Sequence, residues 1–347
     1  MPLDGGGVVN HVKYKTFIRS KEMPVVVFRG IEGWCDRLQV LAHCLQYCLQ
    51  FNTSLCVDWH DTVWGGGDFD FNSCFTLEGV KTMSRPQVLK LVATGRMDVR
   101  PPCWDLKSIV RHLDGETWKD KYIGEFMKFD LVKCGGDVLV TNGRGERQWD
   151  CRLLCKHLRF KPAVVEGIRQ RLNNFDPNSI VVHLRGTDRP DAEGNYTEKA
   201  VEAARKTGIH PNQVFVVTDQ KELWERFVAG FPGARLVNPA SNILRLPPSK
   251  NGTHQFHSHE LERSGVKKWD MMLDLLADWV ALVSASTAMG RSESTYFSMA
   301  RSLHELTWEE MLGGWKPFSK TLQEYNETLL LSQTEIQQGT GEHVPTA

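Results

Sequence analysis

The 347-residue chain lacks a long apolar run. No stretch approaches the roughly 20 consecutive apolar residues that a membrane-spanning helix needs. The first ten residues, Met1 to Asn10, are rich in glycine and have no apolar core of the kind found in signal peptides. We therefore expect a cytoplasmic protein with no membrane span, or a soluble piece of a protein whose anchor lies elsewhere.

The sequence also lacks an excess of charge of either sign. Lysine and arginine number 42, and aspartate and glutamate also number 42. Proteins that bind nucleic acid usually carry a basic excess, so we expect no nucleic-acid partner. An overall balance of charge does not exclude a local basic pocket for phosphate. Hydrophobic residues make up 41% of the chain, as in an ordinary globular protein with a substantial core.

Metal-binding patterns are few. The nine cysteines include no Cys-x-x-Cys pair, and we expect them to be reduced. Asp68-Phe69-Asp70 has the Asp-x-Asp pattern that can hold a divalent cation, but this pattern is common by chance. A polar stretch also contains three histidines with the spacing of metal ligands, His254, His257 and His259. Solvated side chains are the simpler interpretation of these histidines. We expect no metal site.

The first half begins with an alternation of strand and helix. The β-branched run at residues 25–28 predicts a buried strand, and the apolar periodicity that begins near Asp36 predicts a helix. Residues 55–58 predict a second strand. This βαβ unit favours a parallel sheet with a right-handed crossover.

The second half repeats the theme. We expect strands at residues 180–184, 214–217, 235–237 and 280–283, and helices at 163–172, 271–277 and 296–303. The polar stretch 241–266 is expected to be a long loop. Two α/β domains follow from this alternation, at residues 1–160 and 161–331, with a disordered tail at 332–347.

Polar residues are concentrated directly after the predicted strands, where open α/β sheets bind their ligands. His183 and Arg185 follow one strand and share a face of it, because side chains alternate along a strand. An arginine there can make a bidentate contact with a phosphate. The simpler alternative is a strand end carrying a salt bridge to solvent.

Two further segments have polar groups in suggestive positions. Ser294 and Thr295 open a predicted helix, and such a helix N-terminus can bind an anion, although a simple N-cap is the alternative. Asp274 and Asp278 lie one turn apart on a mainly apolar helix, where carboxylates need a partner or water. Asp274 could accept hydrogen bonds from a guanine edge, or it could lie on a solvated helix face.

Together these segments resemble the fucosyltransferase superfamily that includes the α1,6-fucosyltransferases and the protein O-fucosyltransferases. The resemblance is scattered over residues 25 to 303, and its strength is the shared order of short motifs. These motifs are Gly30-x-x-Gly33-x-x-Asp36-Arg37-Leu38, Val57-Asp58-Trp59, His183-x-Arg185-x-Thr187-Asp188, Val217-Thr218-Asp219, Leu273-Asp274 and Ser294-x-x-x-Ser298-x-Ala300.

The resemblance implies a GT-B fold, in which two Rossmann-like domains face each other across a cleft and the second binds GDP. It implies inverting, metal-independent transfer of L-fucose from GDP-fucose to a glycan or protein-linked hydroxyl, without a further cofactor. Arg185 would hold the donor β-phosphate. The other donor-binding residues that it implies are His183, Asp219, Asp274, Ser294, Thr295, Gly33 and Asp36.

Deprotonation of the acceptor requires a base within hydrogen-bond reach. Glu193 lies eight residues after Arg185, the offset at which the core-type α1,6-fucosyltransferases carry a glutamate. Arg189 stands where those enzymes have a lysine. Asp191 is the rival base, and an exposed turn is the simpler interpretation of this segment.

Three residues depart from the family pattern. Gly186 replaces a second arginine of the core-type enzymes, Gln220 replaces the second aspartate of Thr-Asp-Asp, and Cys35 replaces a glycine. Two alternatives therefore stay open: a degenerate protein that binds a GDP-sugar or glycan without turnover, and a transferase of the same fold that uses another GDP-sugar. The acceptor is also open, and Trp59 and Trp64 could stack on it or belong to the core.

Overall fold

The computed structural model describes residues 25–29, 33–59, 71–93, 99–100, 138–141, 150–186, 195–247 and 258–317. Its first sheet has four parallel strands in the order β2-β1-β5-β4. The strands are β1 (Val25–Arg29), β2 (Ser54–Asp58), β4 (Val99–Arg100) and β5 (Val138–Thr141). Helix α1 (Trp34–Phe51) connects β1 to β2, as the sequence predicts, and α3 (Arg85–Ala93) follows β2.

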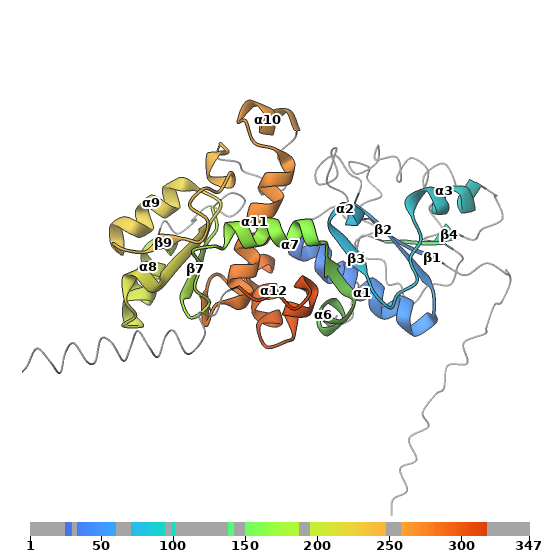
Figure 1. Ribbon diagram of the computed structural model, residues 1–347, viewed down its shortest axis with the longest axis horizontal. Coiled ribbons are helices and arrows are strands. Elements are labelled where there is room, and N and C mark those ends of the chain that lie inside the picture. The colour runs from blue at the N-terminus through green and yellow to red at the C-terminus, as the bar shows by residue number, and fades with distance from the viewer. Residues whose placement is uncertain are drawn as a thin grey trace, which may run out of the picture.

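The second sheet is also parallel, in the order β10-β7-β8-β9. It lies at the opposite end of the molecule from the first sheet (Figure 1). Its strands are β7 (Ile180–Leu184), β8 (Val214–Thr218), β9 (Arg235–Leu236) and β10 (Thr287–Met289). The connecting helices include α8 (Tyr196–Lys206) and α9 (Lys221–Gly230). The prediction of an α/β chain with parallel sheets is confirmed.

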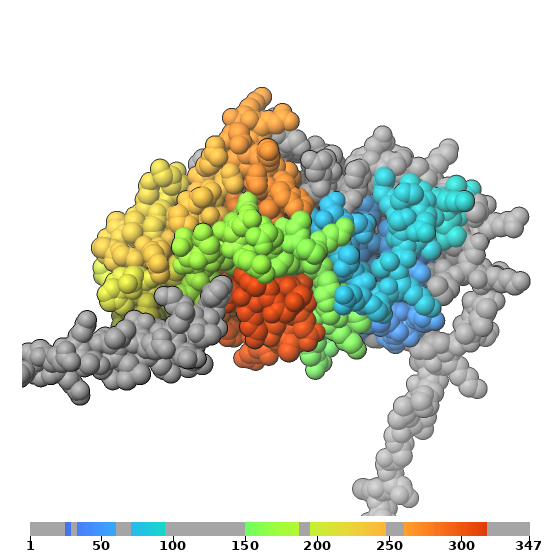
Figure 2. All heavy atoms as spheres, in the orientation of Figure 1, coloured from blue at the N-terminus to red at the C-terminus, as the bar shows by residue number. Residues whose placement is uncertain are grey.

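Several helices lie between the two sheets (Figure 1). They are α6 (Arg152–His157), α7 (Pro162–Arg171), α11 (Lys268–Ser284) and α12 (Thr295–His304). Residues 150–186, green in Figure 2, run across the surface from the blue first half to the yellow second half. The remaining elements are α2 (Phe71–Cys74), the antiparallel pair β3 (Phe75–Leu77) and β6 (Leu158–Phe160), α10 (Ser258–Arg263), and the 3-10 helices η2 (Pro211–Gln213), η3 (Ile243–Arg245) and η5 (Trp308–Leu312).

One apolar core extends through both halves of the chain. It includes β1 and α1 from the first half and α7, α11 and α12 from the second. At its centre the ring of Trp34 meets that of Trp279 edge to face, with 5.7 Å between centroids. A smaller cluster lies between β7, β8, α8 and α9. The strands of the two sheets fall on either side of residue 160, and the division into domains at that residue stays a prediction.

The predicted strand at 280–283 is wrong, because these residues form the last turn of α11. A short apolar run fits either a buried strand or a buried helix. Here every residue from Met271 to Val283 is buried, so the helix shows no polar face that would identify it. The strand that joins the sheet is β10, a few residues later. The predicted loop at 241–266 is also partly wrong, because it contains η3 and α10.

Trp59 lies in the interior, with its side chain between Phe28, Trp34 and Phe71. It is therefore a core residue and not an exposed platform for an acceptor sugar. The seven cysteines that the structure describes are free thiols, six of them buried. Among the described helices, none combines the length and apolar character required to span a membrane.

Candidate functional site

The described site begins where β7 and β8 end. These strands are parallel neighbours in a register that sets His183 beside Val217 and Leu184 beside Thr218. Arg185 and Asp219, the next residues on each strand, therefore leave the sheet at the same edge. The backbone N–H of Gly186 donates to Asp219 Oδ1 at 2.9 Å and joins the two strand ends.

His183 is buried beneath this edge. Its ring is nearly parallel to that of Phe297 on α12, with 4° between planes and 6.2 Å between centroids. Burial, and secondarily the charge of Arg185, lowers the pKa of His183 to about 3, so the imidazole is neutral near pH 7. Its Nδ1 atom has no hydrogen-bond partner among the described residues. A neutral histidine with an open ring nitrogen can accept or donate one hydrogen bond.

The charge of Arg185 acts on three neighbouring groups that come from different elements. Burial raises the pKa of the Cys35 thiol, with Asp36 adding to the increase and Arg185 opposing it. Burial likewise raises the pKa of Tyr296, and Arg185 again opposes the increase. With His183 as the third group, the guanidinium lies near the first turns of both α1 and α12.

The N-termini of α1 and α12 adjoin each other at this place. Gly33 is the N-cap of α1 and Asp36 lies in its first turn. The Cys35 Sγ atom, in the same turn, lies 3.8 Å from the backbone oxygen of Tyr296 in the first turn of α12. The structure thus brings Gly33 and Asp36 near Thr295, although their segments are far apart in the sequence.

Ser294 is the N-cap of α12 but does not cap it with its side chain. Its hydroxyl is buried and makes no hydrogen bond within the described part of the chain. The backbone oxygen of Ser294 accepts from the Ser298 N–H at 2.9 Å, so the helix itself is regular from its first residue. A free hydroxyl beside the unpaired N–H groups of a helix N-terminus is suited to bind an anion.

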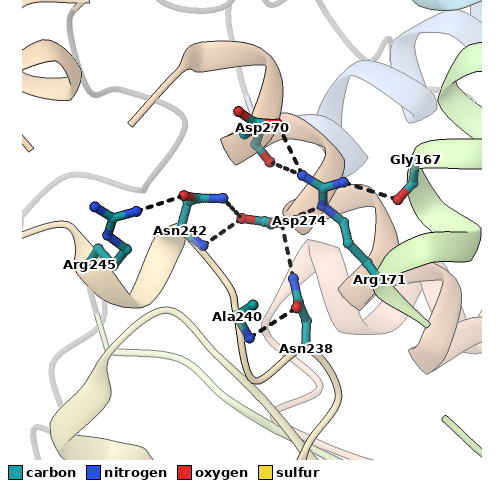
Figure 3. Close-up of polar contacts among 8 residues, drawn as sticks. All are labelled: Gly167, Arg171, Asn238, Ala240, Asn242, Arg245, Asp270 and Asp274. Carbon is teal, nitrogen blue, oxygen red and sulfur yellow. Dashed lines mark hydrogen bonds and ion pairs between the residues drawn. The ribbon is translucent and has the colours of Figure 1, made fainter. Parts of the chain in front are cut away.

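Asp274 already has partners within the protein. Its carboxylate accepts from Arg171 Nε at 2.5 Å, from Asn238 Nδ2 at 3.0 Å, and from the backbone and side-chain nitrogens of Asn242 at 2.6 and 3.0 Å (Figure 3). A carboxylate offers about four acceptor positions. These positions are used within the protein, where the carboxylate joins α7 and α11 to the segment after β9, and the contact of Asp274 with guanine stays a prediction.

Two other carboxyls of α11 lie one turn to either side of Asp274. The Asp270 side chain is 40% exposed and is 3.3 Å from Arg171 Nη2 (Figure 3). Asp278 is buried. Burial raises the pKa of Asp278, and the negative charge of Asp274 adds to the increase. Of the three, Asp270 is the carboxylate that remains accessible to a ligand.

Several predicted residues lie outside the described part of the chain. These are the proposed base Glu193, its neighbours Asp191 and Arg189, the pair Asp68 and Asp70, Trp64, His254 and His257, together with the side chain of His259. Within the residues that the structure describes, no group of three or more His, Cys, Asp or Glu side chains could hold a metal ion.

The partners of Asp274 could not be recognised in the sequence. Arg171 is 103 residues away in the chain, and Asn238 and Asn242 lie in a segment without motif character. The one available signal was chemical: a carboxylate on an apolar helix requires a partner. That signal indicates that a partner exists but does not identify it.

No family model and no curated protein matches the sequence. Solved structures do match the fold. The chain is similar to the NodZ α-1,6-fucosyltransferase co-crystallised with GDP, with a TM-score of 0.53, 16% identity, and coverage of 81% of this chain and 92% of that one. It is also similar to the fucosyltransferase NodZ from Bradyrhizobium, with a TM-score of 0.52, 19% identity, and coverage of 81% and 93%.

A third similar structure is NodZ soaked with GDP-fucose, with a TM-score of 0.50, 17% identity, and coverage of 82% and 93%. At such identities the likeness concerns the course of the backbone. The fold is shared with NodZ. The mixed α/β architecture with parallel sheets agrees with the sequence prediction, and the arrangement of two domains across a cleft stays a prediction.

Proposed function

We propose that the chain is a glycosyltransferase that takes L-fucose from GDP-fucose and transfers it, with inversion and without a metal ion, to a hydroxyl of a glycan or glycoconjugate. The second half of the chain would bind GDP. The first half would form the acceptor side of a GT-B cleft between two Rossmann-like domains.

The observation that carries this proposal is the position of Arg185 in a shared fold. The chain has the fold of enzymes that were crystallised with GDP and with GDP-fucose. Arg185 follows β7 at the carboxyl edge of the second sheet, which is where α/β sheets bind nucleotides. Fixed positive charge and helix N–H groups there support binding of a diphosphate.

The leaving diphosphate would be stabilised by groups that are already in place. Arg185 supplies a charge, and Ser294 and Thr295 supply hydroxyls and N–H groups at the start of α12. Such preorganised groups contribute most when negative charge develops in the transition state. His183 would add one neutral hydrogen bond, and Asp219 would hold the segment after β7 through its bond with Gly186.

For the guanine we propose Asp270 in place of Asp274. The Asp270 carboxylate is partly exposed on the same helix, next to the guanidinium of Arg171. The segment after β9, which Asp274 holds, follows a strand of the same sheet edge. A carboxylate can accept from the N–H groups of a guanine edge. Asp274 would then act indirectly, by fixing Arg171 and the segment around Asn242.

For the acceptor we keep Glu193 as the proposed general base, with Arg189 near the departing phosphate. A carboxylate base removes the hydroxyl proton as the sugar is transferred. Arg185 and Arg189 would balance the charge of the diphosphate, a task that a divalent metal ion performs in metal-dependent enzymes. Inversion follows if the acceptor attacks from the face opposite the leaving group.

Calorimetric titration with GDP tests the donor site. We expect the wild-type protein to bind GDP equally well with and without EDTA, and Arg185→Ala to lose most of that binding because the charge facing the phosphate is gone. Arg226→Ala is the matched control, since this exposed arginine pairs with Glu198 on the outer helices of the same sheet. Equal binding by wild type and Arg185→Ala would contradict the donor-site assignment.

Transfer itself needs a separate measurement. Incubation with GDP-fucose and an array of glycan acceptors, followed by NMR of the product, would give both the linkage and the anomeric configuration. A product with inverted configuration in the presence of EDTA is expected. GDP binding without transfer to any acceptor would instead favour the degenerate binding protein, an alternative raised by Gly186 and Gln220.

A further inference from the structure

Gly186 and Gln220, two of the residues that depart from the family pattern, are in contact. A Cβ atom on Gly186 would lie 2.4 Å from Gln220 Oε1 and 2.7 Å from its Cδ. These distances are shorter than real Cβ contacts. The carboxamide of Gln220 therefore occupies the space in which a side chain at position 186 would begin, and the two departures form one structural change.

Space, and not backbone conformation, is what favours a glycine at position 186 while Gln220 keeps this rotamer. Gly186 is not among the described glycines with positive φ, so its backbone conformation is open to other residues. The limit comes from Gln220 and from Leu223, whose Cδ1 atom would be 2.8 Å from the added Cβ. Any larger residue at 186 would displace the carboxamide.

The carboxamide of Gln220 has no hydrogen-bond partner among the described residues, whereas its backbone is fully used. The Gln220 N–H bonds Thr218 Oγ1 at 3.2 Å, and its carbonyl accepts from the same hydroxyl and from the Trp224 N–H. Gln220 is the N-cap of α9, yet its side chain makes no capping bond. A partly buried amide that neither caps nor pairs has donors and an acceptor available for a ligand.

The position of this amide suits a neutral, hydroxyl-rich group. Gln220 follows Asp219, which bonds Gly186 N, and Gly186 follows Arg185, the proposed diphosphate ligand. If Arg185 holds the diphosphate, the amide would lie close to the bond that joins the donor sugar to the phosphate. A carboxamide offers both a donor and an acceptor, as a sugar hydroxyl does, and it adds no charge beside the diphosphate.

We propose that Gln220 hydrogen-bonds the hydroxyls of the donor sugar, and that Gly186 provides the space that this contact requires. The inference rests on the proposed function, because it specifies a subsite of the same donor. Gln220 is thus a specificity-determining residue that acts on the sugar, whereas Arg185 acts on the diphosphate.

The test compares GDP with GDP-fucose, which differ only in the sugar. We would titrate both ligands into wild type, Gln220→Ala, Gly186→Ala and Gln213→Ala. The control Gln213 precedes β8 at the opposite end of the strand. Because the Gln220 side chain makes no cap bond, its truncation should leave α9 intact, and circular dichroism would check this.

Gln220→Ala should bind GDP as wild type does and GDP-fucose about tenfold more weakly, the upper range for one neutral hydrogen bond. Gly186→Ala should show the same selective loss, because its methyl displaces the carboxamide. An equal loss for both ligands, or no loss for either, would overturn this inference while leaving the donor site in place. A wild-type protein that binds neither ligand would overturn the proposed function itself.

Discussion

At the scale of single residues, Asp274 and Asp278 show how one helical turn separates two carboxyls with different environments. Asp274 is 1% exposed, but an arginine and two asparagines donate to its oxygens. Asp278 is also buried but has no such donors in the described part of the chain, and burial beside Asp274 raises its pKa. The two carboxyls thus differ in their hydrogen-bond donors, although they lie one turn apart on the same helix.

Breaking the Arg171–Asp274 pair should destabilise the protein. We expect Asp274→Asn to lower the free energy of unfolding by about 3 kcal/mol, since removing one member of a buried pair leaves Arg171 with the more distant and partly exposed Asp270 as its counter-charge. Urea denaturation measures this quantity. The comparison is Lys206→Met, which breaks an exposed pair with Glu202 and should cost about 0.5 kcal/mol or less. Equal losses in the two variants would contradict a special role for the buried cluster.

Asp278 should make stability depend on pH in a definite direction. Its pKa is raised in the folded state, so the folded state binds the proton more tightly than the unfolded state does. The resulting stabilisation is complete below the unfolded pKa and is lost as pH rises through the folded value. We expect Asp278→Asn to be more stable than wild type at pH 7, with the difference shrinking toward pH 5.

Unfolding curves at several pH values measure this difference, with the exposed Glu222→Gln as the control that should follow wild type at every pH. A wild-type protein whose stability relative to Asp278→Asn stays constant from pH 5 to 7.5 would show that Asp278 is ionised in the folded state.

His183 should make stability depend on pH in the direction opposite to that of Asp278. The pKa of His183 is lowered to about 3 by burial, so the unfolded state takes up the proton first as the solution is acidified. Stability from this group is present above about pH 6.5 and is lost as pH falls toward 3, by up to roughly 1.4 kcal/mol for each pH unit. His183→Gln should show a shallower loss between pH 6.5 and 5 in the same denaturation experiment.

Residue-scale features were predicted unevenly from the sequence. The strand-end position of His183, Arg185 and Asp219 followed from strand patterns alone, because parallel neighbours end at one edge. The hydrogen bonds that occupy both oxygens of Asp274 could not be predicted in this way, because Arg171 is brought to Asp274 only by the packing of α7 on α11. Sequence identifies residues that need partners, whereas only the fold selects those partners.

At the scale of elements, the position of the first turn of α12 against the second sheet depends on one glycine. A Cβ on Gly290, directly after β10, would lie 2.6 Å from the ring of Phe297. That ring is the surface on which His183 stacks. The absence of a side chain at position 290 therefore lets α12 approach the sheet closely enough to bring Ser294 and Thr295 to the edge.

Gly290→Ala should move this helix. We expect a loss of about 1–3 kcal/mol in stability, as for other overpacked cores, and weaker GDP binding because Ser294 shifts with the helix. Calorimetric titration and thermal unfolding measure the two effects. The double variant Gly290→Ala with Phe297→Leu makes room for the methyl and should recover part of both. If the single variant bound GDP normally, the close approach would have no role in the donor site.

The type of element was harder to predict where burial is complete. α1 was recognised from its periodic apolar residues, whereas the last turn of α11 was mistaken for a strand. A helix buried on all sides has no polar face, so its sequence loses the period of 3.6 residues on which recognition depends. The same burial makes α11 the central helix of the core, in contact with α7 and α12.

At the scale of the whole molecule, the shared core joins the two halves. Trp34 of α1 contacts Trp279 of α11 edge to face and stacks on Phe75. Because these residues lie in one continuous cluster, each half buries part of its apolar surface against the other. We therefore expect the described halves to unfold together and not as independent domains.

Calorimetry can test this coupling. Wild type should unfold in one transition whose midpoint rises as a whole when GDP is added. Trp34→Ala should destabilise the protein by about 3–5 kcal/mol, the usual cost of deleting a buried aromatic side chain. Leu49→Ala, on an exposed position of the same helix, should have little effect. Two separate transitions in wild type, with only one shifted by GDP, would contradict the shared core.

The contact between Gly186 and Gln220 also makes the effects of substitutions at the two positions depend on each other. A side chain that enters position 186 displaces the carboxamide of Gln220 and crowds Leu223, because it would fill the same space. A shorter residue at position 220 removes the first of these two contacts. The cost of a given side chain at 186 therefore differs with the residue at 220, and the two positions form an epistatic pair.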